Sequence, residues 1–282
     1  MKKFQLALLF TMLYGACSVG QAQTSKYPFE VSITGKGNRA IVFIPGFSCS
    51  GDVWNETRKD YENAYTCYTL TMAGFAGVNP VGEIKFSAWE KGIATYIIDN
   101  KITKPIIIGH SMGGGLAMAI AADYPDLLSG IIVVDALPCL SAMMNPTFKS
   151  KENNDCSAMT QQIVSASSED FLHMQKASIA SLMSDTTMQD LVVGWSVKSD
   201  RKTFGDMYCD FSNTDLREKI IAIKCPALIL LESYFANFKP AMKDQFKNLQ
   251  TANLQYANKG LHFIMYDDTE WYNAQLKKFL TQ

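Results

Sequence analysis

Short apolar runs alternate with longer segments of helical periodicity along most of the chain. The apolar runs are rich in β-branched and aromatic residues, as strands are, and lie at residues 29–33, 40–44, 65–70, 104–108 and 131–134. Segments of helical pattern lie between them, at residues 52–61, 86–100 and 114–122. Because strands that alternate with helices at this spacing form a parallel sheet with helices on both faces, the pattern predicts an α/β fold.

The alternation stops between residues 141 and 211, where only helical periodicity continues. An apolar run at 225–231 restores the strand pattern. It is followed by a helix, a short strand and a last helix, whose expected N-cap is Asp268, at 239–248, 254–257 and 269–280. We therefore expect a helical cap, residues 141–211, inserted into an α/β core made of residues 23–140 and 212–282.

Residues 1–22 have the pattern of a signal peptide. Two lysines precede an apolar segment that is too short to span a bilayer, and small residues precede a cleavage site after Ala22. We therefore expect an exported protein, either periplasmic or secreted. The Leu-Tyr-Gly-Ala-Cys stretch that ends at Cys17 is similar to a bacterial lipoprotein signal, so a lipid anchor at Cys17 is the alternative.

Composition excludes several classes of partner. The 282 residues carry a formal net charge of −1 and no basic block, so nucleic acid is not expected as a partner, and neither is a membrane span. Three histidines and the absence of a Cys-x-x-Cys pair argue against a zinc site, and we expect neither a metal nor a cofactor. Beyond Cys17, an even number of cysteines permits disulfides in an exported protein, but sequence cannot choose among 15 pairings, and buried thiols are the alternative. These cysteines are Cys49, Cys67, Cys139, Cys156, Cys209 and Cys225.

The stretch Gly-His-Ser-Met-Gly around Ser111 carries the strongest chemical signal. It separates the apolar run 104–108 from a helical segment of small residues, so Ser111 is expected at a strand-to-helix turn. This context is that of a nucleophile elbow, which presents a serine hydroxyl above the edge of a sheet. The backbone N–H of Met112, at the start of the new helix, could then donate to a developing oxyanion.

A second backbone donor is expected after the apolar run 40–44. That run leads into Pro45 and Gly46, and the N–H of Phe47 is the candidate donor. An ordinary turn at the end of a strand is the alternative. Its position, one strand–helix–strand unit before Ser111, favours the functional interpretation.

His262 is the best-placed general base. It lies in a loop between the last predicted strand and the last helix, whereas His110 belongs to the serine turn and His173 to the cap. Two acids follow core strands and could reach it, Asp135 and Glu232. Asp135 ends the strand next to the one before Ser111, although it could also be a structural carboxylate that opens a turn.

The order of these motifs resembles the α/β-hydrolase superfamily. The resembling segments are Ile-Pro-Gly-Phe, Gly-His-Ser-Met-Gly, Val-Asp-Ala-Leu-Pro and Gly-Leu-His-Phe. The resemblance implies Ser111 as nucleophile, His262 as base, and Phe47 and Met112 as oxyanion donors. Most relatives carry the acid, usually Asp, after the strand that corresponds to 227–231, but no Asp occurs in the six residues that follow it here.

Some members of the superfamily are similar in placing the acid one strand earlier. We therefore assign the acid to Asp135 and keep Glu232 as the alternative. The expected activity is that of a cofactor-independent serine hydrolase, most simply of a carboxylic ester. A C–C bond hydrolase and a ligand-binding protein that retains the fold are the alternatives.

The composition of the cap bears on the substrate. Seven of the 14 methionines lie in residues 141–211. Packing among the cap helices is the simpler explanation, but methionine also suits the wall of an adaptable apolar pocket. We therefore expect a small-molecule substrate with a hydrophobic moiety.

Overall fold

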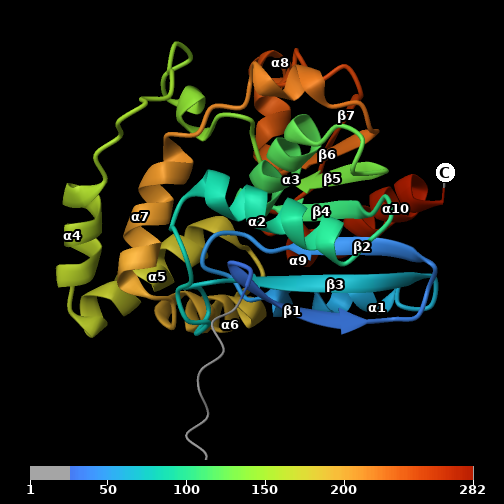
Figure 1. The fold of residues 1–282 in the computed structure, drawn as a ribbon. Coiled ribbons are helices and arrows are strands. Elements are labelled where there is room, and N and C mark those ends of the chain that lie inside the picture. The colour runs from blue at the N-terminus through green and yellow to red at the C-terminus, as the bar shows by residue number, and fades with distance from the viewer. Residues whose placement is uncertain (1–25, 282) are drawn as a thin grey trace, which may run out of the picture.

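Within residues 26–281, which this computed structural model describes, seven strands form one sheet through the centre of the molecule (Figure 1). The predicted signal peptide and Cys17 lie outside the described residues. The strands are β1 (Phe29–Thr34), β2 (Arg39–Ile44), β3 (Tyr65–Met72), β4 (Ile106–His110), β5 (Gly130–Val134), β6 (Ala227–Leu231) and β7 (Ala252–Tyr256). Their order is β1-β3-β2-β4-β5-β6-β7, and every neighbouring pair is parallel except β1 with β3.

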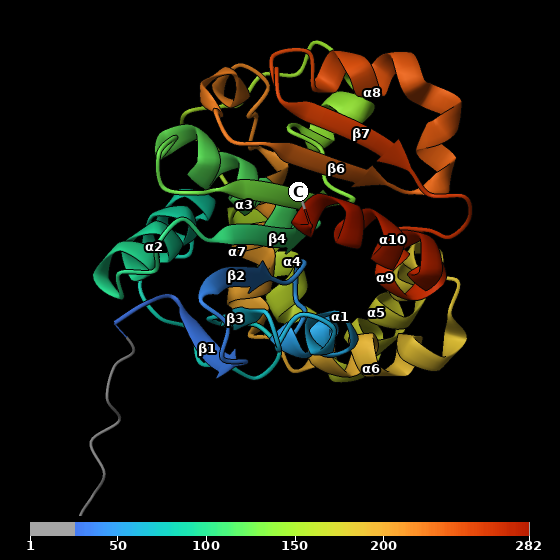
Figure 2. The same cartoon turned by 90° about the vertical axis from the view of Figure 1, so that its right-hand side faces the viewer.

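Both faces of the sheet are buried under helices (Figure 2). Successive side chains of β2 alternate between two apolar clusters, with Val42 and Ile44 in one and Ile41 and Phe43 in the other. The first cluster includes α2 (Phe86–Asp99), α3 (Met112–Asp123) and α8 (Lys239–Gln245). The second includes η1 (Gly51–Trp54), which leads into α1 (Asn55–Lys59), together with α9 (Ile264–Asp267) and α10 (Thr269–Leu280). This arrangement confirms the predicted α/β fold, because parallel strands need cover on both faces.

The order of the strands determines where a ligand site can form. Strand β3 lies on one side of β2 and strand β4 on the other, so the chain changes direction across the sheet between β2 and β4. Ligands of open α/β sheets bind outside the carboxyl ends of the strands at such a switch point. The loop after β2 and the turn after β4 meet there.

Four α-helices lie between β5 and β6 and form the cap (Figure 1). They are α4 (Ser157–Ser165), α5 (Ser168–Leu182), α6 (Thr186–Val197) and α7 (Arg201–Ser212), and α4 packs on α7 while α5 packs on α6. The sequence predicted helices close to α5, α6 and α7 but missed α4, a helix of only nine residues. The short helices η2, η3 and η4 span Leu140–Met143, Lys219–Ala222 and Ser233–Phe238.

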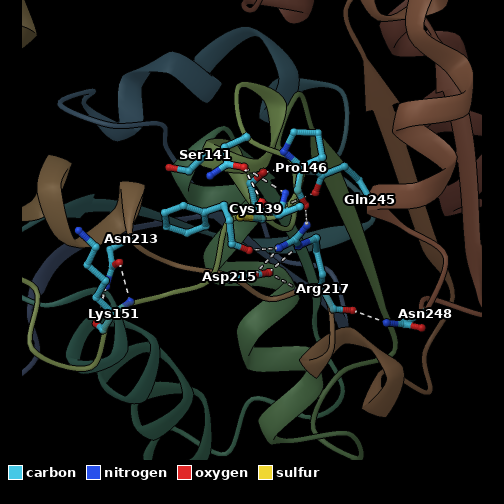
Figure 3. Close-up of polar contacts among 12 residues, drawn as sticks. Cys139, Ser141, Pro146, Lys151, Asn213, Asp215, Arg217, Gln245 and Asn248 are labelled. Carbon is cyan, nitrogen blue, oxygen red and sulfur yellow. Dashed lines mark hydrogen bonds and ion pairs between the residues drawn. The ribbon is translucent and has the colours of Figure 1, made fainter.

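The two chain segments that connect the cap to the core are bound to each other (Figure 3). The guanidinium of Arg217 donates to the carbonyl oxygens of Pro146 and Phe148 and pairs with the carboxylate of Asp215 at 2.6 Å. On the core side, the side chain of Gln245 from α8 bonds both backbone polar groups of Cys139. The segments that lead into and out of the cap therefore lie side by side on the core.

The cysteines divide between the two expected states. Cys156, just before α4, forms a disulfide with Cys209 of α7. The other four described cysteines are buried thiols, namely Cys49, Cys67, Cys139 and Cys225. Burial raises the pKa of Cys49 to about 12, so this thiol stays protonated and unreactive.

The disulfide should stabilise the cap. Its two cysteines are 53 residues apart, and a crosslink of that span typically contributes about 2–4 kcal/mol by restricting the unfolded chain. Cys156→Ser combined with Cys209→Ser should lower the free energy of unfolding by about this amount, measured by urea denaturation without reductant. Dithiothreitol should lower the urea midpoint of the wild type to that of the double variant and leave the midpoint of the variant unchanged. A wild-type midpoint that does not respond to reductant would contradict this.

Candidate active site

Ser111 lies in a tight turn between β4 and α3, with φ at 53° and ψ at −122°. A positive φ is strained for a residue with a side chain and is retained only where surrounding contacts enforce it. A Cβ atom at Gly109 would collide with the carbonyl oxygen of Gly113, and one at Gly113 with that of Ile44, so both positions require glycine. The strand, turn and helix that the sequence predicted around Ser111 are present.

The backbones of both predicted oxyanion donors lie close to Ser111. Met112 is the first residue of α3, where backbone N–H groups have no acceptor within the helix. The loop after β2 approaches from the other strand, because a Cβ atom at Gly46 would lie 3.3 Å from Cβ of Ser111 and 2.7 Å from Nδ1 of His110. Phe47 follows Gly46 directly, so its peptide group borders the serine turn.

The side chain of Phe47 belongs to an aromatic cluster that includes rings of the cap and of the core. Its ring centre lies 4.6 Å from that of Phe204 and 5.5 Å from that of Tyr208, both on α7. Phe75, in the loop after β3, lies 4.9 Å away on the core side. Phe47, whose backbone borders the serine turn, therefore packs against aromatic rings from both the cap and the core.

His262 and Asp135 form a short hydrogen bond. Nδ1 of His262 lies 2.7 Å from Oδ2 of Asp135, which is buried at the end of β5 with φ at 49°. Since a carboxylate only accepts, the Nδ1 proton lies on this bond and Nε2 is the free ring nitrogen. The structure therefore brings these two predicted site residues together, as the sequence predicted for the far nitrogen of His262.

Glu232 reaches Asp135 through its backbone and not through its carboxyl group. The N–H of Glu232 donates to Oδ1 of Asp135 at 2.7 Å. Burial, together with the nearby charge of Asp135, raises the pKa of the Glu232 carboxyl to about 7. In this position Glu232 supports the carboxylate that His262 contacts.

His110 connects the serine turn to the histidine loop. Its ring is fully buried, and Nε2 lies 3.0 Å from the carbonyl oxygen of His262, whose ring centre is 4.6 Å away. Burial, together with the charge that His262 can carry, holds the pKa of His110 well below its usual range. His110 therefore stays neutral and has a structural role beside Ser111.

Two neighbouring aspartates hold the loop that carries His262, and the sequence did not reveal this role. Asp268 was expected to cap α10, but its carboxylate instead accepts from the backbone N–H groups of Asn258 and Lys259. Asp267 accepts from the N–H of Leu261 at 2.8 Å. Backbone acceptors of this kind leave no spacing signal in a sequence, because they depend on how a loop folds back.

The remaining histidine lies outside the site. His173 is on α5 with 74% of its side chain exposed, 3.9 Å from the carboxylate of Glu169. No group of three or more histidine, cysteine or acidic residues that could hold a metal ion occurs within residues 26–281. None of the helices in this part of the chain is long and apolar enough to cross a membrane.

The fold is similar to that of several solved hydrolases. A hydrolase from Oleispira antarctica superposes with a TM-score of 0.75 at 16% identity, covering 91% of this chain and 96% of that chain. The enol-lactonase from Burkholderia xenovorans LB400 gives 0.74 at 15% identity, covering 90% and 96%. An esterase from Exiguobacterium antarcticum gives 0.73 at 17% identity, again covering 90% and 96%. At these identities the likeness concerns the fold alone.

The sequence matches parts of two curated proteins, and it also matches one family model. This chain is 25% identical over 108 residues to the pimeloyl-[acyl-carrier protein] methyl ester esterase of Citrobacter koseri, covering 38% of this chain and 41% of the relative. It is 30% identical over 112 residues to the enzyme of the same name from Wigglesworthia glossinidia brevipalpis, covering 40% and 42%. The match thus spans about two fifths of these relatives. A family model matches residues 41–274, and the chain therefore belongs to the alpha/beta hydrolase family.

Proposed function

We propose that this chain is a serine hydrolase of carboxylic esters with Ser111, His262 and Asp135 as its catalytic triad. The observation that carries the proposal is the 2.7 Å bond between His262 and Asp135 at the sheet edge that presents Ser111. Members of this family include hydrolases, and the partial relatives are named as methyl ester esterases. An ester is therefore the substrate class with the most support.

In the proposed reaction, Oγ of Ser111 attacks the ester carbonyl and its proton passes to Nε2 of His262. The imidazolium is stabilised by Asp135, which also holds the ring in the required tautomer. The N–H groups of Phe47 and Met112 donate to the oxyanion of the tetrahedral intermediate. His262 then protonates the leaving alcohol, and a water molecule deprotonated by the same ring hydrolyses the acyl-enzyme.

We assign the acyl group of the substrate to the aromatic cluster beside Phe47. Rings from Phe75, Phe204 and Tyr208 surround this position, and apolar surface buried there contributes roughly 25 cal/mol per Å². A small ester with a hydrophobic acyl moiety fits this environment. No cofactor enters the proposed reaction.

The nucleophile assignment predicts that Ser111→Ala abolishes turnover of activated esters. The substitution removes one hydroxyl and leaves the turn, so the thermal unfolding midpoint should stay near that of the wild type. Nitrophenyl esters of graded chain length measure turnover, and a fluorophosphonate probe should label the wild type at Ser111 only. His173→Ala, in the exposed part of the cap, serves as the control with full activity.

An activity of Ser111→Ala within tenfold of the wild type would exclude Ser111 as the nucleophile. Tight ligand binding by a folded, unlabelled wild type would favour the ligand-binding alternative.

The acid assignment predicts a large difference between two carboxamide variants. Asp135→Asn should lower kcat strongly, on the order of 10⁴-fold, because the ring of His262 loses the acceptor that fixes its tautomer. Glu232→Gln should lower it by about tenfold or less, since its backbone N–H, and not its side chain, contacts Asp135. Steady-state kinetics on one ester compare the two. The reverse ranking would move the acid to Glu232.

The raised pKa of Glu232 predicts a specific dependence of stability on pH. The folded protein holds the Glu232 proton up to about pH 7, whereas the unfolded chain releases it near the ordinary value for glutamate. The folded state therefore binds more protons between these values, and this group lowers stability as the pH rises through them. Urea midpoints should fall less between pH 5 and pH 8 in Glu232→Gln than in the wild type. Glu270→Gln, at an exposed position of α10, should follow the wild type, and parallel curves for all three proteins would contradict the prediction.

A further inference from the structure

A chain of buried hydroxyl and amide groups connects the loop of Phe47 to the cap. The hydroxyl of Ser48 lies 3.0 Å from that of Ser196 on α6, which lies 2.7 Å from Oε1 of Gln175 on α5. An amide oxygen only accepts, so Ser196 donates to Gln175 and Ser48 donates to Ser196. All three side chains are buried, and breaking the chain would leave polar groups without partners.

This chain acts on a strained part of the backbone. Ser48 has φ at 55°, a conformation that a serine keeps only when neighbouring contacts enforce it. The carbonyl oxygen of Gly46 shares a peptide group with the N–H of Phe47 and accepts from the N–H of Cys49 at 3.2 Å, so the direction of the Phe47 N–H depends on the turn that contains Ser48. The cap thus supplies a hydrogen bond that holds this loop.

A second connection runs from the same part of the cap to the histidine loop. The carboxylate of Asp267 accepts from the N–H groups of Ser184 and Asp185, at 3.0 and 2.9 Å, in the turn between α5 and α6. It also accepts from the N–H of Leu261, the residue before His262. One carboxylate therefore binds the cap turn and the histidine loop at once, and bonds of this charged type are stronger than neutral ones.

The helices α5 and α6 are packed firmly enough to serve as a reference for both loops. Their side chains Ile179, Val192 and Trp195 are buried in the same apolar cluster as Phe263 and Ile264, which follow the histidine. Because closely packed interiors transmit displacement instead of absorbing it, a shift of this helix pair would move both loops.

We propose that the helix pair α5–α6 is part of the catalytic framework, with Ser196 and Asp267 as positioning residues for the N–H of Phe47 and for the ring of His262. The inference rests on the proposed function. It adds that cap and core determine the geometry of the oxyanion donor and of the base together. The cap is then more than a cover over the substrate.

The oxyanion side is tested with Ser196→Ala, Ser48→Ala and the double variant. Counting active sites with a fluorophosphonate removes any effect of a smaller folded fraction. Per active site, kcat should fall about tenfold with KM within about twofold and an unchanged pH profile, as for loss of an interaction made in the transition state. Binding of a trifluoromethyl ketone, which forms an oxyanion adduct, should weaken by a similar factor.

The double variant should lose no more kcat than either single variant, because both substitutions act through one hydrogen bond. Ser181→Ala is the matched control, since this hydroxyl bonds only within α5.

The histidine side is tested with Asp267→Asn and the control Glu270→Gln. Asp267→Asn should shift the pH profile of kcat/KM, and the amides of Ser184, Asp185 and Leu261 should exchange their hydrogens faster. Ser184→Pro, which removes one of the two N–H donors on the cap side and none on the core side, should change exchange at Leu261 as well. Met183 before it is extended, with ψ at 128°, as a proline requires.

The two sets of measurements separate this inference from the proposed function. Wild-type kinetics and exchange in Ser196→Ala and Asp267→Asn would overturn the role of the helix pair while leaving the esterase intact. If Ser196→Ala does not fold, Ser48→Ala decides the oxyanion side, because Ser196 keeps its bond to Gln175. If the wild type hydrolyses no ester, the exchange of Leu261 in Ser184→Pro still decides the coupling. Unchanged exchange there would overturn it.

Discussion

The left-handed backbone at the carboxyl ends of three adjacent strands is the constraint on which this site depends. Ser48 follows β2, Ser111 follows β4 and Asp135 follows β5, each with a positive φ. Conformations of this kind cost about 1–3 kcal/mol each, and they persist because surrounding contacts enforce them. The N–H of Ser111 donates to the carbonyl of Val134, and that of Asp135 donates to Leu230. The sheet thus holds Ser111 and Asp135 in directions that an isolated loop would not keep.

Much of this arrangement could be predicted from local pattern. Alternating apolar runs and helical segments indicated a covered parallel sheet, and the glycines around Ser111 indicated a tight strand-to-helix turn. The place of Asp135 next to His262 could also be predicted, because Asp135 ends a strand that neighbours the one before Ser111. In each case the information lies within about ten residues of chain or in the order of adjacent strands.

Features that depend on distant contacts were not predictable in the same way. The pairing of Cys156 with Cys209 depends on α4 packing against α7, and α4 itself, at nine residues, is too short to show a clear period. The role of Asp267 depends on three backbone donors from two separate segments, which carry no preferred residue type. Asp268 illustrates the same limit, because its position before a helix indicated a cap while the fold directs its carboxylate elsewhere.

The paired entry and exit of the cap have a consequence for how such proteins diversify. The hydroxyl of Ser141 donates to the carbonyl oxygen of Ser212 at 2.6 Å, so the inserted segment begins and ends at one point on the core. An insertion with adjacent ends can be lengthened, shortened or exchanged without altering the register of β5 and β6, since closing a longer loop adds little entropy cost. Any replacement would have to supply partners for Ser48 and Asp267, which makes compatibility with two loops, and not length, the filter on which caps this core can accept.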